Sequence, residues 1–146
     1  MTPSPKIIAF VKDFEKCRLS AYMPTPNDRP TIGWGTTGSD IHMGLVWTQA
    51  QADERFAKDF AAFAAKVAAL LGKHSTTQGQ FDAMVSLAYN IGTGGFGSST
   101  LLRKHLAADY AGAAEQFARW NKQAGKVLNG LTRRRAGEAA IYRGQA

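Results

Sequence analysis

The chain has 146 residues, of which 45% are hydrophobic and 20% are charged, and its formal net charge is +7 at pH 7. This composition is typical of a globular domain and excludes a disordered chain. No stretch approaches the roughly 20 apolar residues of a membrane-spanning helix, and the N-terminus shows no secretory signal. One cysteine, Cys17, excludes an internal disulfide, and we expect it to be a small buried filler.

The first third of the chain predicts a helix followed by a β-hairpin. Residues 4–16 carry apolar side chains at helical spacing behind Ser4, a candidate N-cap. Residues 18–36 alternate in polarity around a turn-rich run and predict the hairpin. Gly33 and Gly35 lie in its second strand, where glycine often marks a close approach. A small third strand or a loop is expected through residues 38–47.

The rest of the chain predicts helices. Capping boxes at residues 48–51 and 77–80 open a long helix to residue 71 and a strongly apolar helix to residue 91. The glycine-rich run 92–97 predicts a helix stop and a turn. Three shorter helices are expected at about 98–107, 110–120 and 131–142. The order of elements predicts an α+β fold in which the sheet is segregated from the helices.

No sequence motif indicates a cofactor or a metal. The chain lacks a Walker A loop, a Gly-x-Ser-x-Gly elbow, a His-Glu-x-x-His helix and a cysteine pair. The positive charge favours an anionic partner, which is nucleic acid, a membrane surface or a wall polymer. Basic residues gather around Arg133, Arg134 and Arg135, but no aromatic side chains alternate with them. We therefore expect no nucleic-acid partner.

Glu15 is the carboxylate of most chemical interest. It closes the first apolar helix immediately before the hairpin. A carboxyl group placed against apolar surface has its pKa raised by desolvation, which suits a general acid at neutral pH. The other interpretation is an ordinary exposed residue at a helix end, and the pattern alone does not choose between the two.

Four blocks of sequence resemble one family, in order along nearly the whole chain. They are EKCRLSAY with TIGWG at 15–22 and 31–35, QFDAMVSLAYNIG with SSTLL at 80–92 and 98–102, WNK with GKVL at 120–122 and 125–128, and GLTRRRAGE at 130–138. Together they resemble phage-type lysozymes, the endolysins related to T-even and lambdoid phage lysozymes.

The resemblance implies a single lysozyme-like domain over residues 1–146. Its β-lobe would span about 17–47, and its helical lobe about 72–146 plus the N-terminal helix, joined by the long helix. It also implies an N-acetylmuramidase that hydrolyses the β-1,4 bond between N-acetylmuramic acid and N-acetylglucosamine in peptidoglycan. The site would lie between the lobes, with Glu15 as the acid and Thr31 holding the attacking water.

The sequence departs from the family at the usual catalytic aspartate. The family has that aspartate nine residues after the glutamate, where this chain has Pro24. Asp28, in a turn that is one residue longer, and Thr25 are the two candidate replacements. Thr36 stands where the family commonly has histidine. The departure keeps two alternatives open, a lytic transglycosylase and an inactive wall-binding protein.

Further residues match family positions around the site. Tyr89, Asn90, Phe96 and Ser99 match positions that contact or border the glycan, although Tyr89 and Phe96 also suit a core and Ser99 a helix cap. The resemblance implies that an arginine supports Glu15. The candidates are Arg134 and Arg135.

The same resemblance implies where the protein acts. Its partner would be bacterial peptidoglycan, and the basic segment 122–143 would favour an anionic outer-membrane surface, unless it packs as an ordinary helix with a basic exposed face. We expect a monomer that accumulates in the host cytoplasm. It would reach the wall through a pore formed by a separate protein, a holin.

Overall fold

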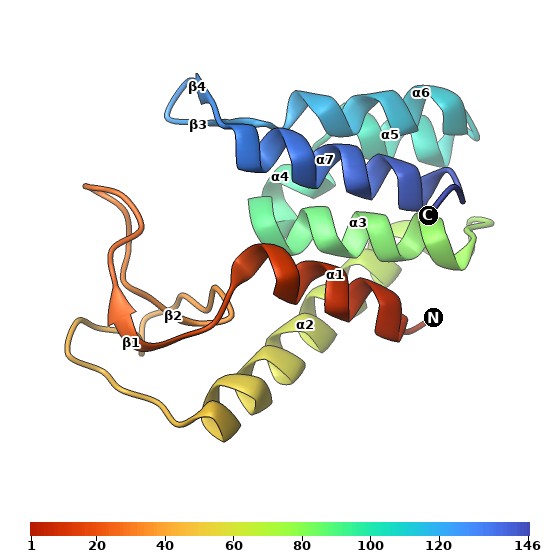
Figure 1. Ribbon diagram of the computed structural model, residues 1–146. Helices are drawn as coiled ribbons and strands as arrows, with labels where there is room; N and C mark the ends of the chain where they lie inside the picture. Colours follow the sequence, from red (N-terminus) through yellow and green to blue (C-terminus); the bar gives the residue numbers. More distant parts are fainter. The chain divides into compact units, whose positions relative to one another are not determined.

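The computed structural model describes all 146 residues, and the chain forms two compact units (Figure 1). One unit comprises residues 9–60, and the other comprises residues 1–8 with 61–146. Helices α1 (Pro5–Glu15) and α2 (Gln49–Leu71) each run from one unit into the other. The small sheet expected at 17–47 therefore belongs to a unit that also contains the end of α1 and the first half of α2.

Unit 9–60 is built around a two-stranded antiparallel sheet. Strands β1 (Arg18–Tyr22) and β2 (Thr31–Gly33) pair Arg18 with Gly33 and Tyr22 with Thr31. The register shifts between these two pairs. A third segment joins the outer side of β1, where Ser20 forms a bridge with Val46. The expected third strand is thus a single bridge. The buried apolar side chains of this unit are Val11, Ile32, Ile41, Ala52, Phe56 and Phe60.

Helix α2 begins where the capping pattern predicts. The Thr48 amide donates to Gln51 Oε1 at 2.8 Å, and the Gln51 amide donates to Thr48 Oγ1 at 3.2 Å. These two bonds satisfy amides that have no partner within the helix. Inside unit 9–60 the helix buries Phe56 and Phe60, whose rings stack at 5.1 Å. The cap and the apolar stripe together explain the helix.

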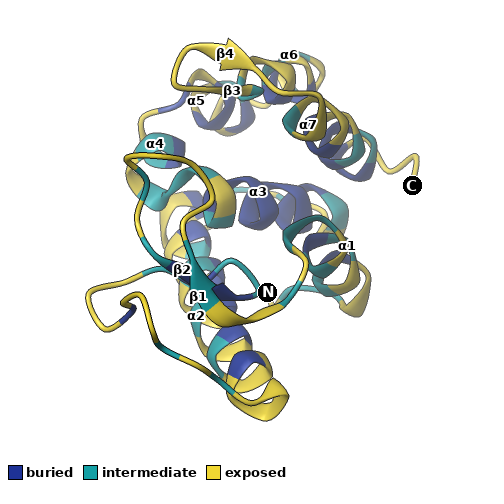
Figure 2. Cartoon of the chain, turned by 60° about the vertical axis from the view of Figure 1, so that its left-hand side comes forward, coloured by how far each residue is buried: buried dark blue, intermediate teal, exposed yellow.

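The other unit is a helical assembly centred on α3 (Gln78–Ile91). The predicted capping box at Thr77 and Gln80 is present, and every residue from Gln80 to Ala88 is buried (Figure 2). Helix α7 (Asn129–Tyr142) packs on α3, and α6 (Tyr110–Gln116) packs on α5. The remaining helices are α4 (Thr93–Gly97), α5 (Thr100–Leu106) and the 3-10 turn η1 (Phe117–Arg119). The central-core prediction for α3 is confirmed.

Two local predictions in this unit are wrong. Gly92 ends α3 with a φ of 96°, as expected, but residues 93–97 then form the short helix α4 instead of a turn. Burial of the Phe96 side chain accounts for that extra turn of helix. Before α7 the chain also forms an unexpected hairpin of strands β3 (Lys122–Gln123) and β4 (Lys126–Val127). Among the helices, none is both long and apolar enough to cross a membrane.

Candidate active site

Glu15 is the last residue of α1, and the next residue turns the chain out of the helix. Lys16 has a φ of 58°, in the left-handed region, while its amide still donates to the Lys12 carbonyl at 3.0 Å. This arrangement is a common way to end a helix. The Glu15 side chain is half-buried. The carboxyl group is therefore fixed at the junction between α1 and β1 and remains reachable from solvent.

Gly35 packs directly against the Glu15 carboxyl group. It lies in a three-residue loop closed by paired backbone bonds between Ile32 and Thr36, of 3.0 and 2.8 Å, and has a φ of +87°. A Cβ atom at Gly35 would lie 2.3 Å from Glu15 Oε1 and 2.9 Å from Glu15 Cδ. No real side chain tolerates such contacts, so the carboxyl seat requires glycine here. The expected second strand ends at Gly33, so Gly35 lies in the loop that follows it, and what approaches Gly35 is the Glu15 side chain.

Thr31 is the first residue of β2, and its hydroxyl group donates a hydrogen bond. The side chain is 6% exposed, and its Oγ1 donates to the Arg29 carbonyl at 3.1 Å. A hydroxyl that donates its one hydrogen keeps lone pairs that accept hydrogen bonds. Thr31 can therefore accept a hydrogen bond from a water molecule.

The turn between β1 and β2 brings the two candidate replacements together. Thr25 Oγ1 donates to Asp28 Oδ2 at 3.2 Å, and the Arg29 amide donates to Asp28 Oδ1 at 2.8 Å. Pro24 is exposed and carries no titratable group. Asp28 is half-buried, and both of its oxygens accept hydrogen bonds. The sequence left Asp28 and Thr25 as alternatives, and the structure joins them as one hydrogen-bonded pair.

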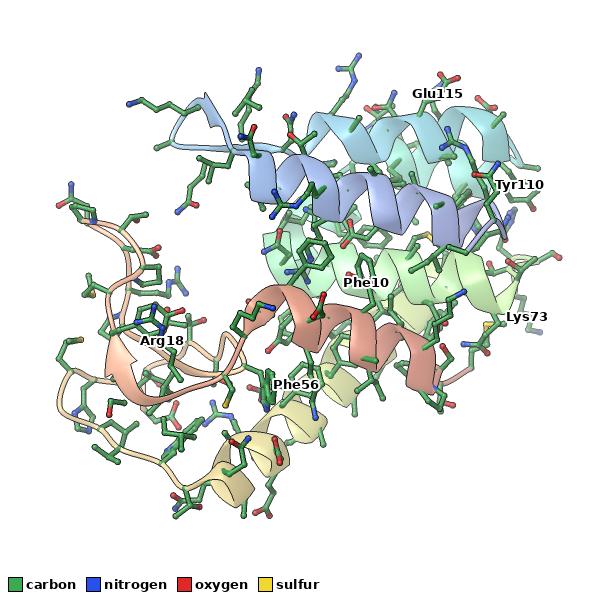
Figure 3. All side chains as sticks on the ribbon, viewed as in Figure 1. Phe10, Arg18, Phe56, Lys73, Tyr110 and Glu115 are labelled. Carbon is green, nitrogen blue, oxygen red and sulfur yellow. The ribbon has the colours of Figure 1, made fainter.

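Tyr22 lies within the electrostatic field of both candidate carboxylates. Burial raises the pKa of the Tyr22 phenol, the charge of Arg18 opposes that rise, and the negative charges of Glu15 and Asp28 add to it. The Arg18 guanidinium lies over the Tyr22 ring at 4.3 Å from its centroid, and Figure 3 shows Arg18 on the strand that follows α1. Both residues belong to the EKCRLSAY block, yet sequence reasoning gave neither a role. The motif itself was the signal that could have found them.

The proposed glycan-contacting residues have different environments in the helical unit. Tyr89 is half-buried, with its ring edge-on to Phe63 at 5.3 Å, and Asn90 is exposed. Phe96 is completely buried. Ser99 caps α5 by accepting from the Leu102 amide at 3.1 Å and donates to the Phe96 carbonyl at 2.6 Å. Tyr89 and Asn90 are therefore accessible, whereas Phe96 packs in the core and Ser99 caps a helix.

Arg134 and Arg135 surround a buried carboxylate that sequence analysis missed. Glu138 lies 2.6 Å from Arg135 Nε and 3.4 Å from Arg134 Nε, and its Oε2 accepts from the Ser86 hydroxyl at 2.5 Å. All three charged side chains are buried. Their spacing of three and four residues on one helix was the available signal. Both arginines thus have a partner within this unit, and support of Glu15 by either stays a prediction.

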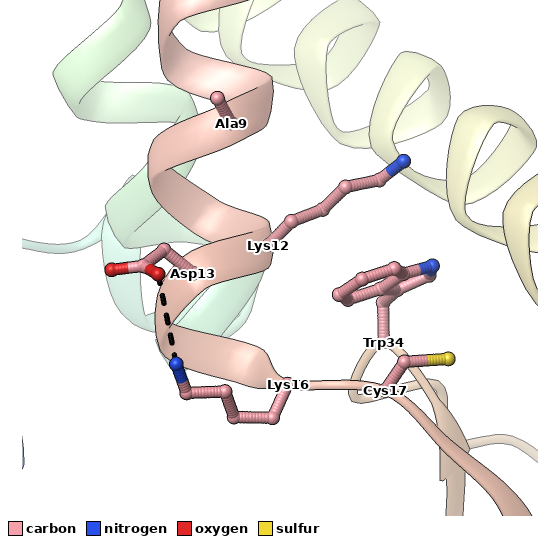
Figure 4. Close-up of a pocket in the computed structure, with 6 residues that line it drawn as sticks. All are labelled: Ala9, Lys12, Asp13, Lys16, Cys17 and Trp34. Carbon is pink, nitrogen blue, oxygen red and sulfur yellow. Dashed lines mark ion pairs between the residues drawn. The ribbon is translucent and has the colours of Figure 1, made fainter.

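A shallow pocket of about 410 Å³ opens beside α1 (Figure 4). Lys12 lies 5.0 Å above the Trp34 ring, and Trp34 Nε1 donates to Asp53 at 2.7 Å. This hydrogen bond holds the pKa of the Asp53 carboxyl below its usual value.

Cys17 lines this pocket and is half-buried, so its prediction as a buried filler is wrong. Gln49 donates weakly to its sulfur at 3.5 Å. The lining residues are Ala9, Lys12, Asp13, Lys16, Cys17 and Trp34.

No group of three or more histidine, cysteine or acidic side chains is arranged to hold a metal ion. The candidate site residues are the Glu15 carboxyl at the end of α1, the Thr31 hydroxyl at the start of β2 and the Asp28 carboxyl in the turn between the strands, and a helical assembly accompanies this small antiparallel sheet. This combination defines the lysozyme-like α+β fold, which solved phage endolysins and lysozymes share with this chain.

The chain belongs to the phage lysozyme family, whose profile matches residues 12–138. It is 43% identical over 136 residues to an endolysin of Bacillus phage B103, covering 92% of this chain and 51% of that protein. It therefore spans about half the length of the first curated relatives it matches.

Two solved structures share the fold closely. The endolysin from Escherichia coli O157:H7 phage FAHEc1 has a TM-score of 0.86 and 38% identity, over 100% of this chain and 96% of that one. The muramidase domain of SpmX from Asticaccaulis excentricus has a TM-score of 0.83 and 33% identity, over 95% of each chain. The recognition of the family from sequence blocks is confirmed.

Proposed function

We propose that the protein is an endolysin that hydrolyses the β-1,4 bond between N-acetylmuramic acid and N-acetylglucosamine in peptidoglycan. The observation that carries this proposal is the seat of the Glu15 carboxyl at the end of α1 against Gly35. Thr31 and Asp28 lie in the same compact unit. The names of the relatives, endolysin and muramidase, agree with this assignment.

Glu15 supplies the acid. Cleavage of a glycosidic bond passes through an oxocarbenium-like transition state, and protonation of the leaving oxygen makes that state accessible. A carboxyl group fixed by backbone on one side and open to solvent on the other can present its proton to one oxygen without first being ordered. The glycine at position 35 provides that fixed side.

Thr31 orients the attacking water. Its hydroxyl donates to the Arg29 carbonyl, so a water molecule binds as a donor to Thr31 Oγ1. The oxygen of that water then has a lone pair directed away from the threonine and available to the sugar. Hydrolysis with inversion needs a water held on the face opposite the acid, with about 6.5–9.5 Å between the two working groups.

Asp28 takes the role that the family gives to the aspartate at the position of Pro24. A carboxylate can accept a proton from the attacking water or stabilise positive charge on the sugar ring. Thr25 and the Arg29 amide hold Asp28 through hydrogen bonds of 3.2 and 2.8 Å. Thr25 thus positions the carboxylate and does not replace it.

The helical unit contains the residues proposed to contact the glycan. Tyr89 and Asn90, near the end of α3, are the accessible residues that match glycan-binding positions. Phe96 is buried in α4 and Ser99 caps α5, so both act through packing and capping. Arg134 and Arg135 both pair with Glu138, and support of Glu15 by one of them stays a prediction of the family resemblance.

The absence of a carboxyl group at position 24 leaves two alternatives to the hydrolase. A lytic transglycosylase needs an acid but no water-activating partner, and it leaves anhydro-muramic ends. A protein that lost catalysis together with the aspartate would instead bind sacculi without cleaving them. Both alternatives keep the fold and differ only in the products released.

The deciding experiment is digestion of purified sacculi by wild type and by Glu15→Gln, with products identified by mass spectrometry. We expect reducing muramic ends from the wild type and a rate at least about 100-fold lower for Glu15→Gln, because the amide has no proton to transfer. Asp13→Asn is the matched control, since Asp13 is an exposed acid on the same helix. Anhydro ends would establish a transglycosylase, and no soluble saccharide would establish a binding protein.

The protein is proposed to act on peptidoglycan when the host cell lyses. It is also proposed to work as a monomer. It leaves the host cytoplasm through a pore that a separate protein forms. The endolysin names of its relatives support this place of action. Lysis of cells that produce the chain with and without a coexpressed pore-forming protein tests it, and lysis of intact cells by the chain alone contradicts it.

A further inference from the structure

The β3–β4 hairpin stands out from the helices to which it is joined. Every residue from 122 to 130 is exposed, as the continuous exposed colouring of the hairpin shows (Figure 2). Its turn is formed by Ala124 and Gly125, with φ values of 52° and 80°. Two successive positive φ values are typical of the tight turn that closes a two-residue hairpin. The Leu128 amide donates to the Asn121 carbonyl at 3.0 Å, which extends the ladder to α7.

Both faces of this hairpin combine a cation with an aliphatic side chain. Lys122 is registered opposite Val127, and Gln123 is opposite Lys126. Residues directly opposite in an antiparallel pair share a face, and successive residues alternate between faces. Lys122 and Val127 therefore lie on one face, and Lys126 and Leu128 on the other. Val127 is 57% exposed and Leu128 is 39% exposed.

The segment around the hairpin carries almost no compensating negative charge. From residue 116 to residue 146 the one acidic side chain is Glu138, which is buried between two arginines. The basic side chains of the same segment are otherwise exposed. They are Arg119, Lys122, Lys126, Arg133 and Arg143.

This combination fits an anionic lipid surface better than an anionic wall polymer. Lysines near a negatively charged bilayer each gain attraction, and aliphatic side chains gain by leaving water for the interface between headgroups and acyl chains. A hydrated polymer of carboxylates or phosphates attracts the lysines but offers the aliphatic side chains no apolar phase to enter. The exposed Val127 and Leu128 therefore decide between the two partners.

We propose that the β3–β4 hairpin is an interfacial anchor that binds the surface of an anionic phospholipid bilayer. Lys122 and Lys126 pair with lipid phosphates, and Val127 and Leu128 enter the interface. The proposal goes beyond the wall-cleaving activity and requires nothing of Glu15. Its failure and the failure of the proposed hydrolase are therefore observed separately.

Vesicle flotation with the full chain tests the anchor. The vesicles are equimolar phosphatidylglycerol and phosphatidylcholine, with pure phosphatidylcholine as the neutral comparison. Wild type is expected to bind the anionic vesicles and not the neutral ones. Lys122→Gln with Lys126→Gln should weaken binding about 30-fold, which corresponds to about 1 kcal/mol for each lysine. Val127→Ser with Leu128→Ser should weaken it at least about tenfold at unchanged charge.

Matched changes elsewhere on the same unit act as controls. Lys66→Gln with Lys73→Gln removes two exposed lysines, and Leu106→Ser removes an aliphatic side chain that is 40% exposed. The controls should bind vesicles within about threefold of wild type. The control lysines lie outside the hairpin and contribute only long-range attraction, which salt screens, and Leu106→Ser changes no charge. All variants should keep their circular dichroism and their activity on lipid-free sacculi.

Two results would overturn the proposal. If Val127→Ser with Leu128→Ser floats as wild type does, the aliphatic side chains do not enter a bilayer. If the hairpin variants lose affinity for sacculi and wild type ignores anionic vesicles, the partner is the wall polymer. Loss of sacculus cleavage with intact vesicle binding would count only against the hydrolase.

Discussion

At the residue scale, the position of the Glu15 carboxyl depends on an atom that Gly35 lacks. The Cβ of any other residue would stand 2.3 Å from Glu15 Oε1, and the glycine φ of +87° already disfavours a side chain. The carboxyl group would have to move away by about 1 Å or more to relieve the contact. Displacements of that size cost catalysis about 100-fold when they affect a positioned group.

We therefore expect Gly35→Ala to lower the rate of sacculus digestion about 100-fold and to lower the free energy of unfolding by about 1–2 kcal/mol. Gly44→Ala is the control, because Gly44 has a φ of +94° in the same unit and has no atom within 4 Å of its Cβ position. It should show a similar loss of stability with normal activity. Equal activity losses in both variants would mean that backbone strain, and not the Glu15 contact, sets the rate.

Asp28 provides a second test at this scale. We expect Asp28→Asn to lower the rate of product release about 100-fold, because the amide neither accepts a proton nor stabilises a cation. Thr25→Val should lower it less than about tenfold, since the Arg29 amide still holds the carboxylate. Initial rates on sacculi, with circular dichroism as the folding check, give both values.

Restoring the family's aspartate completes this test. Pro24→Asp in the Asp28→Asn background should regain activity if position 28 performs the work of position 24. Full activity of Asp28→Asn alone would remove the aspartate from the mechanism and favour the transglycosylase.

At the scale of elements, local signals predicted helix starts well. The capping boxes at Thr48 and Thr77 are confirmed bond by bond, because each joins groups only three residues apart. Two elements were missed, for different reasons. Helix α4 exists where Phe96 is buried, and the β3–β4 hairpin is too short for periodicity to show it.

The motif leaves Ser99 as either a glycan contact or a helix cap, and the structure shows that it caps α5. As the cap of α5 it accepts from the Leu102 amide, and its loss should lower the free energy of unfolding by about 1 kcal/mol. Urea unfolding of Ser99→Ala measures this change. The exposed neighbour Ser98, which donates to the Gly94 carbonyl, is the control, and Ser98→Ala should change stability by less than about 0.5 kcal/mol. A raised KM for sacculi at unchanged stability would instead make Ser99 a glycan contact.

At the scale of the whole molecule, stability depends on a buried histidine that the sequence gave no reason to select. His105 is 0% exposed, and its ring nitrogens lie 2.6 Å from the Tyr142 hydroxyl and 2.9 Å from the Thr76 hydroxyl. The rings of His74 and Tyr110 both pack edge-on against it. Burial, with a smaller contribution from His74, lowers the pKa of His105 to about 4.

The sign of the pH dependence follows from that shift. Above about pH 6.5 His105 is neutral in both the folded and the unfolded chain. Between about pH 6.5 and 4 the unfolded chain binds a proton that the folded chain excludes, so the free energy of unfolding falls as the pH falls. The loss reaches up to about 3 kcal/mol near pH 4.

Urea unfolding across this pH range measures the effect. His105→Asn should be less stable at neutral pH and should lose most of this pH dependence. His42→Gln is the control, because His42 is exposed and its ring contacts the carbonyl of the neighbouring Met43. An unchanged slope in His105→Asn would place the acid sensitivity elsewhere.

The sequence by itself determined the family, the α+β class and the main helices, and it selected Glu15 and Thr31 as predicted site residues. Those features are encoded by neighbours within a few residues or by ordered motif blocks. The tertiary structure alone decided that Gly35 seats Glu15, that Asp28 bonds to Thr25 and that Glu138 pairs with two arginines. Contacts across a turn or across a buried core depend on chain geometry and on burial, and a linear pattern records neither.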